Sequence, residues 1–270
     1  MLPGGWDNRT FRLGDELSVR LPSNEGYVLQ VEKEQRWLPM LASQVPVAIP
    51  EPVGIGLPSE RFPYPWSVYR WLPGRSPSVD MLANDVRFAA DLGDMLAALQ
   101  RVDATGGPLP GPHNFSRGAP PAVYEAETMH AIDLLGSTID AVAVRDVWEA
   151  ATATAWREAP VWFHGDVSDG NLLVDDDGRL AAVIDFGTSG IGDPACDLVI
   201  GMTAMRGDAR EAFRERRALD SDTWARARGW AIWKALIVAA GLAGSHSPDS
   251  EAFKARRTIE FVLEDHRRSQ

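Results

Sequence analysis

The sequence changes character at Pro73-Gly74, and this change constrains the fold more than any other feature. Before this point, proline and glycine recur at short intervals, and the segments between them are rich in aromatic and β-branched residues at 11–13, 17–20 and 66–72. Such segments are typical of β-strands, and Gly14-Asp15 can form the turn between the first two. After this point, apolar residues recur at helical spacing over long stretches, at 84–100, 122–135, 142–155, 224–242 and 250–266. The pattern predicts an α+β protein with a small antiparallel sheet and a larger, mainly helical part.

One helical segment interrupts the strand-rich part, at residues 27–42. Glu34 lies on the apolar face of this segment, so its carboxylate is expected to need a buried partner. Arg20 belongs to the strand segment 17–20 and is also expected to point inward. Because a guanidinium can hold a carboxylate through two hydrogen bonds, we expect these two residues to pair.

Composition excludes several classes of protein. The chain has 270 residues, a hydrophobic fraction of 45% and a net charge of −11, with one cysteine and five histidines. It has no apolar run of about 18 residues and no signal-peptide pattern, so we expect a cytoplasmic protein without membrane contact. The negative charge argues against nucleic-acid binding, and the cysteine and histidine spacing argues against structural zinc. The charge would suit a cationic partner, or would simply keep the chain soluble.

The residues that carry chemistry lie in a strand-rich stretch between residues 161 and 187. In HGDVSDGN, Asp166 stands five residues before Asn171, which is the interval of the HRDxxxxN catalytic loop of protein kinases. Fourteen residues after Asn171, an apolar strand segment ends in Asp185-Phe186-Gly187. Phosphoryl transfer requires a carboxylate beside the acceptor hydroxyl and oxygen ligands for magnesium. An Asp-x4-Asn pair alone is common in loops, but its combination with the strand-terminal Asp-Phe-Gly predicts a phosphotransferase.

The stretches HGDVSDGNLLV and VIDFGTSGIGDPACDL resemble the two signature stretches of the aminoglycoside phosphotransferase family, which is similar to choline kinases and belongs to the protein-kinase-like superfamily. The resemblance is dense over about thirty central residues, moderate at Trp37-Leu38 and VYRWLPG, and weak in the later helices. It implies a bilobal, protein-kinase-like fold. Residues 1–73 would form the nucleotide-binding lobe including the hinge, and residues 74–270 the catalytic and substrate-binding lobe.

The same resemblance implies roles for individual residues. Asp166 would be the catalytic base, and Asn171 and Asp185 would hold Mg²⁺. His164 and Asp197 would be structural residues of the catalytic core. The position of His164 before Gly-Asp at a strand end independently favours backbone hydrogen bonds over titration during catalysis. Asp193, which precedes Pro194, is expected to cap a helix.

The nucleotide site departs from the pattern of the family. Its members place a strand lysine on the α- and β-phosphates and pair that lysine with a helix glutamate. Here the strand offers Arg20, and the only nearby lysine, Lys33, lies on the helix. We expect Arg20 paired with Glu34 to take this place. Gly4-Gly5 and Asn8 form either a turn over the phosphates or an ordinary turn.

The nucleotide base is expected to lie against the linker, at Tyr69, Trp71 and Leu72, although Trp71 could equally serve core packing. The predicted reaction moves the γ-phosphate of ATP or GTP to a hydroxyl of a small molecule, with Mg²⁺ as cofactor. The acceptor would be an antibiotic, such as an aminoglycoside or a macrolide, or a metabolite such as choline, homoserine or a sugar alcohol. The third alternative, to which Arg20 points, is a non-catalytic binding protein that keeps the kinase fold.

A group of acidic residues offers either a wall for a cationic acceptor or an ordinary solvated face. Its members are Glu125, Glu127, Asp133, Glu260, Glu264 and Asp265.

Overall fold

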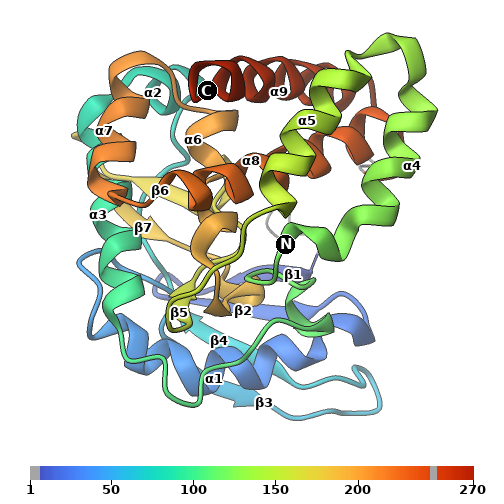
Figure 1. Cartoon of the computed structure of the whole chain (residues 1–270). Coiled ribbons are helices and arrows are strands. Elements are labelled where there is room, and N and C mark those ends of the chain that lie inside the picture. The colour runs from blue at the N-terminus through green and yellow to red at the C-terminus, as the bar shows by residue number, and fades with distance from the viewer. Residues whose placement is uncertain (1–6, 244–247) are drawn as a thin grey trace.

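The computed structural model describes residues 7–243 and 248–270. Its N-terminal part is a four-stranded antiparallel sheet, with strands in the order β1-β2-β4-β3. Figure 1 shows this sheet at one end of the molecule, beside helix α1, with the helical part at the other end. The bounds are β1 (Asn8–Leu13), β2 (Leu17–Pro22), β3 (Pro52–Gly56), β4 (Trp66–Arg70) and α1 (Val28–Ala42).

In the N-terminal sheet, the three strands predicted from the sequence are confirmed and one was missed. β1 and β2 form a hairpin whose turn contains Gly14 at a φ of +60°. The strand predicted at 66–72 ends at Arg70. The missed strand is β3, because its sequence PVGIG has two glycines and a proline, which normally interrupt strands. It lies at the edge of the sheet, where a proline without an N–H group is tolerated.

The helical part follows Pro73-Gly74 and matches the expected long segments closely. Asp85 caps α3 by accepting from the N–H groups of Arg87 and Phe88. Two helices were not predicted: α2, which has only six residues, and α7, whose sequence is mostly charged. The bounds are α2 (Val79–Asn84), α3 (Val86–Arg101), α4 (Glu125–Leu135), α5 (Ala141–Thr152), α6 (Ile200–Thr203), α7 (Gly207–Arg217), α8 (Ser221–Ala239) and α9 (Pro248–Arg268).

Two short antiparallel pairs of strands sit within the helical part. β5 (Val161–Phe163) pairs with β8 (Gly190–Gly192), and β6 (Leu172–Val174) pairs with β7 (Leu180–Val183). The β6–β7 connection is an acidic turn, in which Gly178 has a φ of +79° that favours glycine. The loops that leave β5 and β7 carry the predicted chemistry.

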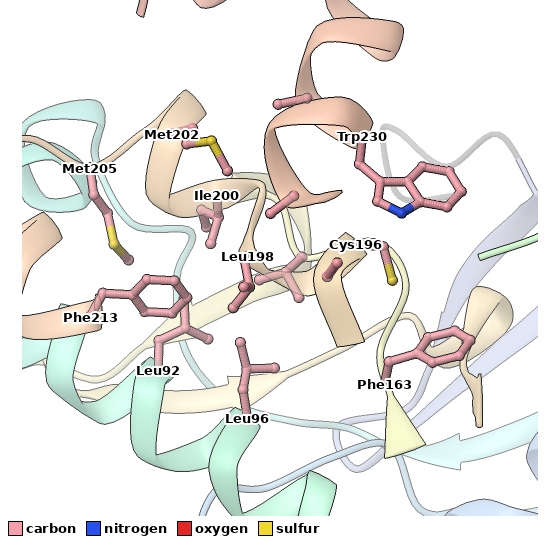
Figure 2. Packing of buried hydrophobic residues seen from close by; sticks show 14 of the residues in the cluster. Leu92, Leu96, Phe163, Cys196, Leu198, Ile200, Met202, Met205, Phe213 and Trp230 are labelled. Atoms are coloured by element: carbon pink, nitrogen blue, oxygen red, sulfur yellow. The ribbon is translucent and has the colours of Figure 1, made fainter. Parts of the chain in front are cut away.

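These loops rest on a continuous apolar core. The buried side chains form one cluster that runs from α1 to α9. Figure 2 shows its centre, where Leu92 and Leu96 of α3 face Leu198 and Phe213, and where Phe163 marks the end of β5. Phe163 is fully buried, so the chain segment that precedes the catalytic loop has little freedom to move. Among the described residues, no helix is both long and apolar enough to cross a membrane.

Candidate active site

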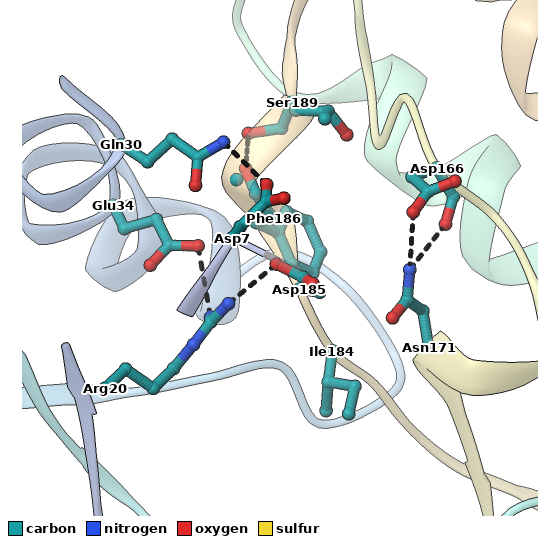
Figure 3. Close-up of polar contacts among 12 residues, drawn as sticks. Asp7, Arg20, Gln30, Glu34, Asp166, Asn171, Ile184, Asp185, Phe186 and Ser189 are labelled. Carbon is teal, nitrogen blue, oxygen red and sulfur yellow. Dashed lines mark hydrogen bonds and ion pairs between the residues drawn. The ribbon is translucent and has the colours of Figure 1, made fainter. Parts of the chain in front are cut away.

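The loop after β5 presents two exposed carboxylates, Asp166 and Asp169, and the first is the predicted catalytic group. Asp166 is solvent-exposed, while the three residues before it are buried. The side-chain amide of Asn171 donates to the backbone carbonyl of Asp166 at 2.9 Å and to its Oδ2 at 3.0 Å. Figure 3 shows this pair across the cleft from Asp185. The side-chain amide of Asn171 therefore holds the carboxylate of Asp166 in place. The side-chain oxygen of Asn171 takes no part in these hydrogen bonds, so it can still bind a metal ion.

His164 connects this loop to the strand that carries Asp185. Its Nδ1 accepts from the backbone N–H of Asp166 at 3.2 Å, so the ring proton lies on Nε2, which donates to the carbonyl of Ile184 at 2.9 Å. Asp197 accepts from the N–H groups of His164 and Gly165 at 2.8 and 2.7 Å. The backbone contacts expected for His164 are present. The ring therefore fixes the catalytic loop relative to the residue before Asp185.

Asp185 follows β7 and Ile184, with its backbone in the left-handed region at a φ of +65°. This conformation is uncommon for a residue other than glycine, and it turns the side chain into the cleft. The N–H of Ile184 donates to the carbonyl of Asn171 at 2.9 Å, which ties the two predicted metal ligands together. Asp185 and Asn171 both line the same cleft.

Arg20 does pair with Glu34, as expected, and it also contacts Asp185. Its Nη1 lies 3.4 Å from Oε1 of Glu34, and its Nη2 lies 2.7 Å from Oδ1 of Asp185 (Figure 3). The hydroxyl of Tyr69 donates to the other oxygen of Glu34. Burial would raise the pKa of Asp185, but the guanidinium of Arg20 outweighs burial and holds that pKa below its usual value. Glu34 thus acts through Arg20, and it does not itself line the cleft.

Lys33 has a different place from the one a phosphate-binding lysine would take. It is buried, and its ammonium donates to the carbonyls of Gly187 at 2.5 Å and Ser189 at 3.0 Å. Burial lowers the pKa of Lys33 from 10.5 to about 8. Lys33 therefore holds the segment that follows Asp185. The sequence placed this lysine on the helix but carried no signal for its contacts.

The cleft that joins these residues has a volume of about 750 Å³. Of the residues predicted for the nucleotide, Arg20, Tyr69, Trp71 and Leu72 line it. Asn8 lines the cleft as well, whereas Gly4-Gly5 lie outside the described residues. The backbone N–H of Trp71 already donates to Glu16, so Trp71 would contribute its side chain.

Asp7 is a further carboxylate in the cleft that the sequence did not reveal. Gln30 donates to its Oδ2 at 3.0 Å (Figure 3). Burial raises the pKa of Asp7, and the negative charges of Asp185 and Asp166 act in the same direction. With Asp166, Asp169 and Asp185, it brings four carboxylates to one cleft, which favours a cationic group among them.

The donor set fits magnesium. Asn171 offers an amide oxygen without a hydrogen-bond partner among the described residues, and Asp185 offers a carboxylate. Within residues 7–243 and 248–270, no cluster of three or more acidic, histidine or cysteine side chains forms a complete metal cage. Magnesium in nucleotide enzymes normally binds to one or two protein oxygens together with phosphates, and this is the set of groups available here.

Most residues of the predicted acidic wall form hydrogen bonds or ion pairs with other residues of the chain. Five of its six members have such a partner. Glu125 and Glu127 accept from the indole N–H groups of Trp148 and Trp233, Asp133 pairs with Arg145, Glu264 pairs with Arg268, and Asp265 pairs with Arg210, Arg214 and Arg228. The expected cap is also present: Asp193 accepts from the N–H of Ala195, and it forms a buried ion pair with Arg226 at 2.6 Å.

Comparison with known proteins identifies the family and the fold. The model of the phosphotransferase enzyme family matches residues 2–230. No curated protein sequence matches the chain. Among solved structures, the GDP and kanamycin complex of the aminoglycoside phosphotransferase APH(2″)-IIIa has a TM-score of 0.72 at 21% identity, covering 99% of this chain and 92% of the other. The macrolide 2′-phosphotransferase from Brachybacterium faecium has a TM-score of 0.59 at 23% identity, covering 93% of each chain. These likenesses establish a kinase-like α+β fold.

Proposed function

We propose a specific kinase reaction for this chain, which belongs to the phosphotransferase enzyme family. In that reaction, the γ-phosphate of ATP or GTP moves to a hydroxyl group of a small molecule. The observation that carries the proposal is that Asp166, Asn171 and Asp185 meet in one cleft, which Arg20 and the linker residues also line. The cleft is large enough for a nucleotide, since ligand sites commonly measure about 300–1,000 Å³.

The chain's own groups account for the steps of the reaction. The exposed carboxylate of Asp166 would accept a hydrogen bond from the acceptor hydroxyl and take its proton. The hydroxyl oxygen then bonds to the γ-phosphorus, while the bond from that phosphorus to the β–γ bridging oxygen breaks and the nucleoside diphosphate leaves. Asn171 and Asp185 would hold Mg²⁺, which supplies positive charge for the phosphates.

Arg20 would serve the nucleotide half of the site in place of the usual lysine. Its guanidinium already holds Asp185, and Glu34 and Tyr69 fix it from behind. The base would lie against Tyr69, Trp71 and Leu72. Other members of this fold support the nucleotide assignment, because solved structures of them hold GDP or ATP.

The acceptor is the least constrained part of the proposal. Solved structures of the same fold include complexes with kanamycin and streptomycin, and one is a macrolide phosphotransferase. An antibiotic acceptor would make the protein a resistance enzyme. A metabolite alcohol is the alternative. Whether expression of the chain raises tolerance to aminoglycosides and macrolides separates these two acceptors.

A binding experiment followed by a turnover experiment tests the function itself. The melting temperature should rise with ATP or GTP only when Mg²⁺ is present, and nucleoside diphosphate should form when a suitable hydroxyl compound is added. A protein that binds nucleotide but forms no diphosphate with any compound of a broad acceptor panel would be a non-catalytic binding protein. That result would refute the proposed reaction.

A further inference from the structure

Lys33 of helix α1 is a buried cation without a carboxylate partner. It is only 8% exposed, and no ion pair joins it to an acid within residues 7–243 and 248–270. Its ammonium donates instead to two backbone carbonyls, that of Gly187 at 2.5 Å and that of Ser189 at 3.0 Å. Lysine is almost never fully buried unless it is paired, so these two hydrogen bonds call for an explanation.

The two carbonyls belong to the short segment that follows Asp185, one of the predicted magnesium ligands. Phe186–Thr188 form one turn of 3-10 helix, and Asp185 precedes this turn with its φ of +65°. A residue other than glycine keeps such a conformation only where the surrounding contacts fix it. The backbone N–H of Gly187 is a hydrogen-bond donor to the carboxylate of Asp185, where it helps to lower the pKa of that group. Lys33 therefore holds the carbonyl of the same glycine whose N–H serves the carboxylate of Asp185.

A second residue of α1 packs against the same segment. Gln30 lies three residues before Lys33, so both side chains lie on one side of the helix. A methyl group at Gly187 would lie 2.7 Å from the side-chain oxygen of Gln30. Gln30 is 3% exposed, and its side-chain nitrogen donates to Asp7 at 3.0 Å (Figure 3). The segment after Asp185 is therefore fixed against α1 at two neighbouring points.

We propose that Lys33 is a positioning residue for the magnesium site, because its hydrogen bonds to Gly187 and Ser189 keep the carboxylate of Asp185 turned into the cleft. The inference rests on the proposed kinase reaction and adds a residue to it. Lys33 does not line the cleft, so it would act on the metal only through Asp185. The alternative is that Lys33 merely provides donors for two buried carbonyls, in which case it would affect stability alone.

The first test measures how strongly magnesium and nucleotide support each other's binding. Calorimetry gives the dissociation constant of a non-hydrolysable ATP or GTP analogue in EDTA and in saturating Mg²⁺, and the ratio of the two constants is the coupling between metal and nucleotide. In Lys33→Met this ratio should fall at least about tenfold, because Asp185 no longer points steadily at the metal. The dissociation constant in EDTA should stay within a few-fold of the wild-type value, since Lys33 does not line the cleft.

Gln35→Met is the matched control on the same helix. Gln35 also donates two hydrogen bonds, to the carbonyl of Gly54 and to the hydroxyl of Ser67, each at 2.9 Å, but both partners belong to the sheet. This variant should lose stability without a change in the coupling ratio. A wild-type ratio in Lys33→Met, or an equal fall in both variants, would overturn the inference.

The second test asks whether magnesium itself rescues the variant. In Lys33→Met, the Mg²⁺ concentration for half-maximal turnover should rise at least about tenfold. Saturating Mg²⁺ should bring the rate back to within a few-fold of the wild-type value, because Asp166 is unchanged. A lower maximal rate with an unchanged Mg²⁺ requirement is the result expected of a purely structural role, and it would contradict the inference.

Gly187→Ala disturbs the same contact from the other side and decides the question if Lys33→Met does not fold. Its methyl group would push the segment away from Gln30 while Lys33 stays unchanged, so the coupling ratio should again fall. An unchanged ratio in this variant would refute the inference as well. If the wild type binds nucleotide no better with Mg²⁺ than with EDTA, the proposed magnesium-dependent reaction fails, and the inference fails with it. If the wild type shows the coupling and Lys33→Met keeps it, only the role of Lys33 is wrong.

Discussion

Replacing Arg20 with methionine should destabilise the protein strongly, because the substitution leaves a buried carboxylate without its counter-ion. Glu34 is only 5% exposed, and its remaining partner would be the hydroxyl of Tyr69. Removing one member of a buried ion pair costs about 3–5 kcal/mol. The retained hydrogen bond places the expected cost near the lower end, at about 3 kcal/mol. Asp185 is a third exposed, so solvent screening makes the loss of its pair with Arg20 a minor addition.

Thermal and urea unfolding measure this cost. At roughly 2–4 °C per kcal/mol for a protein of this size, the melting temperature should fall by about 6–12 °C. Arg70→Met is the matched control, because Arg70 lies on β4, next to the strand that carries Arg20. This substitution breaks only the exposed ion pair between Arg70 and Glu51, so it should lower the free energy of unfolding by less than about 1 kcal/mol. In a double-mutant cycle, Glu34→Gln should recover part of the loss caused by Arg20→Met. Equal effects of the two arginine substitutions would refute the reasoning.

Three further predictions concern the interior. Between pH 8 and 10.5, Lys33 is more protonated in the unfolded chain than in the folded chain. The free energy of unfolding of the wild type, relative to that of Lys33→Met, should therefore rise with pH in this window, by at most about 1.4 kcal/mol per pH unit. Urea unfolding at both ends of the window measures this change. Gly118→Ala should lower the free energy of unfolding by at least about 2 kcal/mol, since the new methyl group would lie 2.1 Å from the ring of Phe163. Gly136 also has a positive φ but has open space around it, so Gly136→Ala should melt at a higher temperature than Gly118→Ala. Asp197→Asn should cost about 1–3 kcal/mol and slow turnover, because its amide cannot accept from both backbone N–H groups at the catalytic loop; unchanged turnover and unfolding would contradict that role.

The elements that the sequence predicted share strong local patterns. The helix at 27–42 and the long C-terminal helices have regular apolar spacing, and the hairpin around Gly14 has a turn that favours glycine. The edge strand β3 escaped prediction because its stability comes from pairing with β4 and not from its own composition. Helix α7 escaped because it buries few side chains, among them Ala209 and Phe213, between many charges.

In the candidate site too, the residues found from the sequence are those with a local sequence pattern. Asp166, Asn171 and Asp185 were found because their spacing along the chain is short and fixed by the loops that carry them. The contact between Arg20 and Asp185 joins residues 165 positions apart, and no local pattern encodes it. The contacts of Lys33 with Gly187 and Ser189 join residues 154 and 156 positions apart, which also lies beyond local sequence patterns.

The central claim is that Asp166 performs the chemistry within an otherwise intact site. The most direct measurement compares Asp166→Ala with the wild type, for both turnover and the affinity for ATP or GTP with Mg²⁺. Turnover should disappear, while the nucleotide affinity should remain within a few-fold of the wild-type value, because Asn171, Asp185 and Arg20 are unchanged. Wild-type turnover in Asp166→Ala would contradict the proposed role of this carboxylate and with it the proposed mechanism.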